Sequence, residues 1–169
     1  MHFLLLGAIG RTGKHVVSKL LSQGHTVVAL VRDAKRIKPQ SNLTIVSGSP
    51  LEQSDIHAAL TAVPSLSVSA AIFTLNTLRK SDSPFAAQVG PPRFLDDSCT
   101  NLCAVLEQAG VRRVVVMSTA GVGDSWGNLP WVSKKFMTWT NIKHALEDHS
   151  LVDEEMHKRD LLNESLARA

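Results

Sequence analysis

Apolar residues along this chain follow two patterns that alternate with each other. Short continuous apolar runs, at residues 2–6, 26–31, 43–46, 68–75 and 111–117, predict buried strands. Longer stretches in which apolar residues recur at helical spacing predict helices over residues 11–23, 52–62, 97–109 and 151–166. Strand and helix therefore alternate along most of the chain.

Strands that are apolar throughout and alternate with helices belong in a parallel sheet covered by helices on both faces. The pattern predicts an α/β fold of the Rossmann type, with three layers and a parallel sheet of about five strands. Loops rich in Gly, Pro, Ser and Asn are expected over residues 76–93 and 119–134. Both follow strands, and such folds bind ligands at the carboxyl edge of the sheet. The length of 169 residues predicts one domain, residues 1–169.

The composition and net charge of the chain argue against two classes of binding partner, membranes and nucleic acids. The chain has 44% hydrophobic and 20% charged residues, as a globular protein has. No stretch approaches the roughly 20 apolar residues that span a bilayer, and the first apolar run is too short for a signal peptide. We therefore expect a cytoplasmic protein with no membrane partner. The net charge of +3 comes from scattered lysines and arginines, so no nucleic-acid partner is predicted.

Candidate metal ligands are few. Cys99 and Cys103 stand four residues apart in a helical pattern, and we expect them to be reduced core residues. His144, His149 and His157 fall in a charged helical tract, where side chains are expected at the surface. No set of His, Cys, Asp and Glu has metal-ligand spacing, so no metal site is predicted.

The turn after the first predicted strand is rich in glycine. It reads G-x-x-G-x-x-G and stands between a strand and a helix, a context that makes it specific for the pyrophosphate of a dinucleotide. Backbone without a Cβ can approach the phosphates, and free N–H groups at the helix start bind them. A tight turn without a ligand is the alternative. The predicted cofactor-binding residues of this turn are Gly7, Ile9, Gly10, Arg11, Thr12 and Gly13.

The end of the second strand predicts which dinucleotide binds. NAD-preferring domains carry an acidic residue there, which accepts hydrogen bonds from the ribose hydroxyls. This chain has Arg32 at that position, with Asp33, Lys35 and Arg36 behind it. A cation suits the 2′-phosphate of NADP(H), and we expect Arg11 to join it. A solvated charge cluster is the alternative.

Three segments together resemble the atypical short-chain dehydrogenase/reductases. They are residues 7–13, the strand ending Val31-Arg32-Asp33 and the strand end at residues 114–121. The most similar members are the NmrA-like and the flavin-reductase or biliverdin-reductase-B-like proteins, and the resemblance covers most of residues 1–160. It implies that NADP(H) lies along the strand ends.

The resemblance also implies roles for residues outside the glycine turn. Leu75, Asn76 and Thr77 would flank the cofactor, and Ser118 and Thr119 would lie near the nicotinamide. The helix that borders the substrate pocket would begin near His157. The implied catalytic residues are Ser118, Thr119 and His157, and Ser118 also counts as a cofactor-binding residue.

The chain departs from the family at the proton donor. Standard members pair a serine with Tyr-x-x-x-Lys, but this chain has no tyrosine. At the same spacing it has Trp131 and Lys135, and an indole N–H does not deliver a proton at neutral pH. A reduction would need a proton from another group or from water. The alternative is that Trp131 and Lys135 simply belong to a loop–helix junction.

A second departure concerns the end of the chain. The family continues into another strand and a substrate-covering region, whereas this chain stops at Ala169. The resemblance therefore implies a sheet without its last strands and a pocket without part of its wall. An uncovered edge and helix face invite association, so we expect either a homo-oligomer or marginal stability.

Two functions from different classes fit this sequence. The first is an NADPH-dependent oxidoreductase acting on a small organic carbonyl, quinone or flavin-like substrate. The second is a non-catalytic, NADP(H)-binding regulator of the NmrA kind, which senses redox state and acts through a protein partner. A remnant without activity is the third reading.

Overall fold

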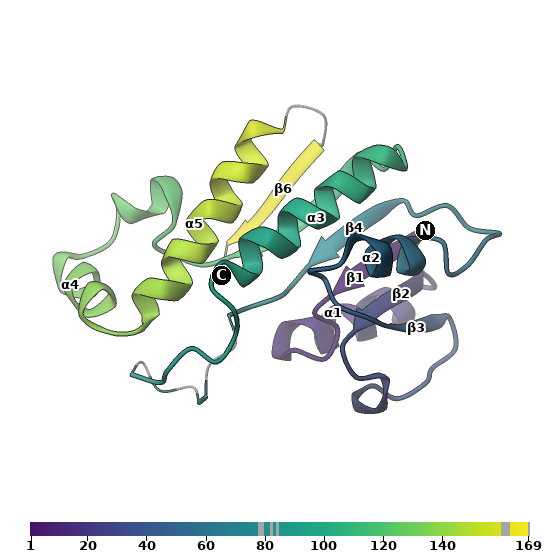
Figure 1. Cartoon of the computed structure of the whole chain (residues 1–169), viewed down its shortest axis with the longest axis horizontal. Helices are drawn as coiled ribbons and strands as arrows, with labels where there is room; N and C mark the ends of the chain where they lie inside the picture. The colour runs from purple at the N-terminus through teal and green to yellow at the C-terminus, as the bar shows by residue number, and fades with distance from the viewer. Residues whose placement is uncertain (78–79, 82, 84, 160–162, 169) are drawn as a thin grey trace.

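The five apolar runs form neighbouring strands of one parallel sheet (Figure 1). The computed structural model describes residues 1–77, 80–81, 83, 85–159 and 163–168. Within them the strands are β1 (His2–Leu6), β2 (Thr26–Val31), β3 (Leu43–Ser47), β4 (Ala70–Phe73), β5 (Arg113–Ser118) and β6 (Asn163–Arg168). Their order is β3-β2-β1-β4-β5-β6, and each neighbouring pair is parallel. The carboxyl ends of β1 and β4 therefore flank the switch point at which such folds bind ligands.

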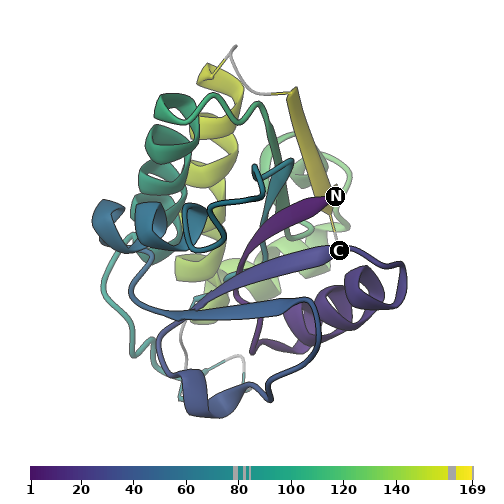
Figure 2. The same ribbon diagram turned by 90° about the vertical axis from the view of Figure 1, so that its right-hand side faces the viewer.

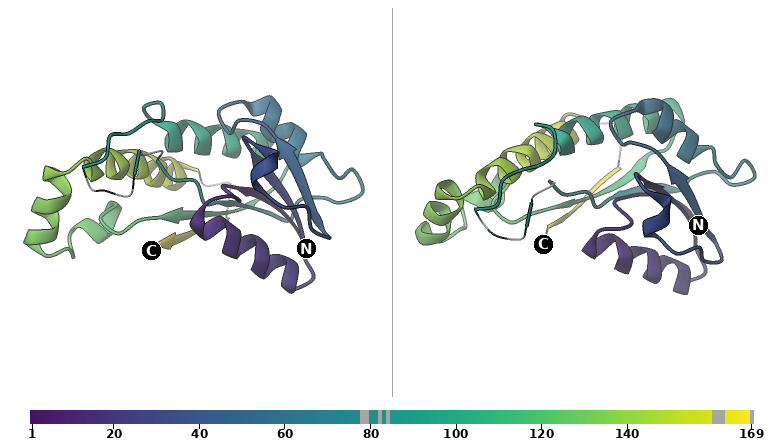
Figure 3. Two further views of the ribbon diagram at one scale, coloured as in Figure 1. Left: turned by 90° about the horizontal axis from the view of Figure 1, so that it is seen from below. Right: turned by 60° about the horizontal axis from the view of Figure 1, so that its bottom comes forward.

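Helices on both faces of the sheet complete the three predicted layers. One face carries α1 (Arg11–Ser22), and the other carries α2 (Gln53–Leu60), α3 (Phe94–Gln108) and α5 (Ile142–Lys158) (Figures 2 and 3). The described loops also contain α4 (Trp131–Trp139) and two 3₁₀ helices, η1 (Ala34–Arg36) and η2 (Gly123–Trp126). The Rossmann-type fold predicted from the sequence is confirmed.

The core explains why the strand runs are apolar throughout. Successive side chains of a strand point to opposite faces, so Leu4 and Leu6 of β1 pack beneath α2, α3 and α5, whereas Leu5 packs beneath α1. All three are at most 1% exposed. Burying each of these side chains contributes roughly 1.5–3 kcal/mol to folding. Both helix layers are therefore stabilised by packing against the same short strand.

The start of α3 is capped by a side chain from a distant helix. The carboxylate of Asp148, on α5, accepts backbone N–H groups of Leu95 and Asp96, each at 3.0 Å. Asp148 is 4% exposed. A carboxylate at a helix N-terminus satisfies unpaired N–H groups and opposes the helix dipole. This contact fixes α5 against α3 at the edge where the candidate site lies.

The end of the chain differs from the sequence prediction. The helix predicted over residues 151–166 ends at Lys158, and Asn163–Arg168 forms β6 instead. Residues 160–162 and 169 lie outside the described part. In the described residues the sheet therefore has six strands rather than five. The helical spacing of Leu162 and Leu166 misled the prediction, because pairing with β5, in the register Arg113↔Asn163, outweighs such a weak local preference.

Other predictions about single elements had mixed outcomes. The loop expected over residues 119–134 contains η2 and the first turn of α4. Of the loop expected over residues 76–93, Leu78, Arg79, Asp82 and Pro84 lie outside the described residues. No helix in the described part of the chain has the length and apolar composition needed to cross a bilayer.

The burial of the two cysteines and of His149 can also be compared with the sequence predictions. Cys99 and Cys103 are reduced and fully buried, as predicted, and both sulfurs lie within 4 Å of the Met156 sulfur. The surface prediction was wrong for His149, which is 5% exposed. It is one of the buried residues of α5, and burial lowers its pKa below the usual range.

Candidate functional site

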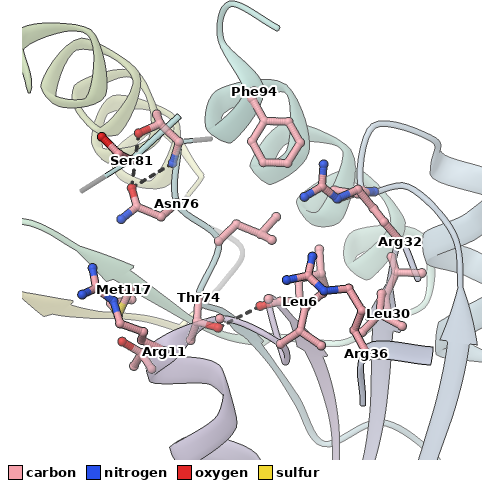
Figure 4. A pocket seen from close by; sticks show the side chains of 18 residues that line it. Leu6, Arg11, Leu30, Arg32, Arg36, Thr74, Asn76, Ser81, Phe94 and Met117 are labelled. Carbon is pink, nitrogen blue, oxygen red and sulfur yellow. Dashed lines mark hydrogen bonds between the residues drawn. The ribbon is translucent and has the colours of Figure 1, made fainter. Parts of the chain in front are cut away.

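A cleft of about 390 Å³ lies at the carboxyl edge of the sheet, over the switch point between β1 and β4 (Figure 4). Nine of the eleven cofactor-binding residues predicted from the sequence line it. They are Gly7, Ile9, Gly10, Arg11, Thr12, Arg32, Leu75, Asn76 and Thr77. The remaining two, Gly13 and Ser118, are adjacent but do not line it. Residues that follow three separate strands, β1, β2 and β4, therefore converge on one groove.

The glycine turn brings the backbone of β1 close to that of β4. Gly7 has a φ of +94°, and a Cβ there would lie 2.7 Å from the Thr74 carbonyl carbon and hydroxyl. Thr74 in turn donates its hydroxyl to the Leu6 carbonyl at 3.0 Å. The turn closes with Gly10 N–H donating to the Gly7 carbonyl at 2.9 Å. Only glycine at position 7 leaves both strand ends this near to each other.

The start of α1 lies at the floor of the cleft and has no side-chain cap on its N–H groups. Its N-cap, Gly10, supplies no side-chain cap, and the first turn contains no acidic residue. The N–H groups of a helix start and its dipole together favour an anion. Gly13 has a different role: a Cβ there would overlap the Gly7 carbonyl, so this glycine lets α1 pack against the turn.

Two arginines lie on the side of the cleft formed by β2. Arg32 follows β2 and Arg36 ends η1, and both line the cleft (Figure 4). Asp33 lies between them, but its carboxylate accepts the Lys35 N–H at 3.0 Å and so caps η1. The positive charge rather than the negative charge of this segment therefore faces the cleft.

Arg11 is not brought to these two arginines. Figure 4 shows its side chain on the opposite side of the cleft, near Met117. The expectation that Arg11 joins Arg32 thus fails, because the first turn of α1 points it toward the β5 side. Arg36 takes that place, and Lys35 does not line the cleft.

The end of β4 forms the wall opposite the glycine turn. Leu75 and Asn76 continue from the strand, and the side-chain oxygen Oδ1 of Asn76 accepts the Thr77 N–H at 2.8 Å. This local bond folds the amide onto its own backbone, as asparagine often does in turns. Phe94, at the first turn of α3, closes the same wall (Figure 4).

The end of β5 carries the predicted serine and threonine. Ser118 is 4% exposed, and its hydroxyl has no hydrogen-bond partner among the described residues. A buried hydroxyl without a partner costs about 1–3 kcal/mol, and such costs are typical of positions that a ligand completes. Thr119, the next residue, is half-buried. Met117, on the other face of the strand, lines the cleft.

His157 lies far from this group. It stands on the last turn of α5, and α5 leads into β6, which runs parallel to β5. The last turn of α5 is therefore at the amino edge of the sheet, opposite Ser118. The His157 Nδ1 lies 2.7 Å from the Asp153 carbonyl. Trp131 is also away from the cleft, with 73% of it exposed on α4.

Several lining residues were not identified from the sequence. Thr74 and Pro50 follow strands, and counting strand ends would have found them. Phe94 and Ser81 come from segments with no strand or glycine signal, so only the fold brings them in. The lining residues that were not among the predicted site residues are Leu6, Leu30, Val31, Arg36, Pro50, Thr74, Ser81, Phe94 and Met117. The described residues hold no cluster of three or more His, Cys, Asp or Glu suited to a metal ion.

Comparison with known proteins agrees with this geometry. A family model described as NAD(P)H-binding matches residues 7–162. A 3-diazoavenalumate denitrifying reductase from Streptomyces sp. is 33% identical over 121 residues, which are 71% of this chain and 38% of that protein. The photosystem II assembly factor Ycf39 from Synechocystis sp. is 27% identical over 153 residues, 86% of this chain and 43% of that protein. The chain thus spans less than half the length of these curated relatives.

Solved structures share the fold. ChuY, an anaerobilin reductase from Escherichia coli O157:H7, matches with a TM-score of 0.75 and 21% identity, over 99% of this chain and 72% of that one. The enzyme WbmH from Bordetella bronchiseptica, solved with NAD+, matches with a TM-score of 0.73 and 18% identity, over 99% of this chain and 55% of that one. The chain therefore belongs to the NAD(P)H-binding family, in agreement with its resemblance to the atypical short-chain dehydrogenase/reductases.

Proposed function

We propose that this chain is an NADPH-dependent oxidoreductase that acts on a small organic carbonyl, quinone or flavin-like substrate. The observation that carries the proposal is a single cleft with an uncapped helix start at one end and two arginines at the end of β2. A pyrophosphate fits the first feature, and a ribose 2′-phosphate fits the second.

The residues present suit a dinucleotide. Gly7 lies against Thr74 with no room for a Cβ, and Gly7 and Gly10 both line the cleft beside the start of α1. The N–H groups of that helix start would hold the pyrophosphate. Arg32 and Arg36 would bind the 2′-phosphate, and Leu75 and Asn76 would flank the nucleotide along β4. When bound, the cofactor supplies a hydride, whereas the protein supplies position and electrostatics.

Ser118 and Thr119 are the residues proposed to act at the reactive end. The buried, unpartnered hydroxyl of Ser118 would bond a carboxamide or a substrate oxygen. Thr119, half-buried at the start of the following loop, would face the substrate. Because Trp131 replaces the usual tyrosine and is exposed, the proton is proposed to come from water. His157 is left out of the mechanism, since it lies at the opposite edge of the sheet.

NADPH oxidation by the purified chain tests the proposal. Quinones, flavins and aldehydes are supplied in turn as acceptors, with NADH run in parallel. We expect turnover with at least one acceptor, faster with NADPH than with NADH. The matched variant is Gly10→Val, which adds a branched side chain at a residue that lines the cleft and that, unlike Gly7, has an ordinary φ of −70°. Equal turnover in this variant would place the activity elsewhere.

A second function is favoured by one observation. The positions that match Tyr-x-x-x-Lys hold Trp131 and Lys135, and both are exposed on α4 rather than turned toward Ser118. A chain that binds NADP(H) without turnover would act as a redox-sensing regulator through a protein partner. Tight NADPH binding with no oxidation across the whole acceptor panel would select this function over the reductase.

A further inference from the structure

One short helix presents its apolar residues to solvent. α4 has nine residues and none of them is buried. Trp131 is 73% exposed, Val132 58%, Phe136 48% and Trp139 86%. Soluble proteins rarely leave aromatic residues exposed side by side in this way, and such patches mark interaction sites.

A loop from another part of the sequence extends the same patch. Phe85 and Val89 are each 66% exposed, and the Phe85 carbonyl accepts a hydrogen bond from the Asn141 side chain at 2.9 Å. This bond holds the loop against the junction of α4 and α5. Six of the eight large apolar residues that the described chain exposes therefore gather at this end: Phe85, Val89, Trp131, Val132, Phe136 and Trp139, here called the α4 surface.

The α4 surface is also positively charged. Residues 127–146 contain three lysines and no aspartate or glutamate. Lys135 is exposed on α4 among the aromatic residues, and Lys143 is exposed on the first turn of α5. Lys134 instead reaches the preceding loop, where its Nζ donates to the Gly127 carbonyl at 3.1 Å. A partner that binds the α4 surface must therefore present both apolar groups and negative charge.

We propose that the α4 surface binds to the surface of an anionic lipid membrane. Tryptophans at both ends of a short helix, with lysines beside them, suit the boundary between headgroups and acyl chains. α4 also lies at one end of the long axis of the molecule (Figures 1 and 3), so a flat surface can reach it. A second copy fits less well, because its own α4 surface offers no carboxylate within residues 127–146 to pair with Lys135. The helix lies on the membrane and does not cross it.

Vesicle co-sedimentation tests the proposal. The intact chain is mixed with vesicles of phosphatidylcholine and phosphatidylglycerol, and with vesicles of phosphatidylcholine alone. We expect binding to the anionic vesicles, a blue shift of tryptophan fluorescence on binding, and weaker binding in high salt. The double variant Trp131→Ser/Trp139→Ser should lose binding, and Lys135→Glu should weaken it on the order of tenfold.

Two control variants outside the α4 surface distinguish binding by this surface from nonspecific binding to vesicles. Leu66→Ser removes an exposed apolar residue elsewhere, and Lys38→Glu makes the same charge change at another exposed position; neither should alter binding. Circular dichroism checks that each variant is folded. The proposal is overturned if the folded chain ignores anionic vesicles, if the α4 variants bind as the parent does, or if light scattering shows a dimer that the tryptophan double variant abolishes.

Discussion

Replacing Arg32 with alanine should weaken NADPH binding about tenfold and leave NADH binding unchanged. A hydrogen bond to a charged group contributes roughly 1.5–3 kcal/mol, and about 1.4 kcal/mol is a tenfold change in affinity. Arg32 is exposed, so solvent screens its charge and the lower end of that range applies. Arg36 lines the same wall of the cleft and would retain part of the attraction.

The double variant Arg32→Ala/Arg36→Ala should therefore lose on the order of 100-fold in NADPH affinity. Lys35→Ala is the matched control, since Lys35 is an exposed cation of the same segment that does not line the cleft. Affinities are measured by titrating the fluorescence of NADPH and NADH against each variant. The reasoning is refuted if the parent chain binds NADH as tightly as NADPH, or if Lys35→Ala matches Arg32→Ala.

The remaining predictions concern stability and turnover. Asp148→Ala should lower the free energy of unfolding in urea by about 2–4 kcal/mol, because two buried N–H groups lose their acceptor; Asp148→Asn, which keeps one oxygen, should lose less. Burial lowers the pKa of His149 and of His2 below 6.5, so the unfolded chain binds protons that the folded chain does not. Stability should be fully present above pH 6.5 and fall as the pH drops through 6.5 toward the folded-state values, and unfolding curves of His149→Gln should show a shallower fall. Thr119→Ala should reduce turnover on a verified substrate more than it weakens NADPH binding; unchanged turnover in both this variant and Ser118→Ala would remove the pair from the mechanism.

The part of the fold that the sequence predicts is the part in which local pattern and tertiary packing agree. β1 and β2 match their predicted bounds because their side chains are buried on both faces and no polar residue interrupts them. β6 was missed because its six residues carry no such pattern, and its place is decided by the free edge of β5. The helical tract before it was identified, but neither its start at Ile142 nor its end at Lys158 was predicted.

The candidate site divides in the same way. The glycine turn is local, so its backbone geometry follows from residues close together in sequence. Arg36 was noted in the sequence, but only the 3₁₀ turn capped by Asp33 directs it toward the cleft in place of Lys35. Phe94 reaches the cleft through the packing of α3 on α5, a contact between segments some 50 residues apart in the chain. The spacing of apolar residues along the sequence does not predict a contact between such distant segments.

The carboxylate of Asp148 has a consequence for where an anion can settle. Both α1 and α3 start at the carboxyl edge of the sheet, and each start is electrically positive. At α3 the protein's own carboxylate already occupies the N–H groups, whereas at α1 none of the first-turn residues is acidic and the cap has no side chain. The fold thus blocks one of two similar anion sites from within, and under the proposed function the phosphate groups of a ligand would bind at α1 rather than at α3.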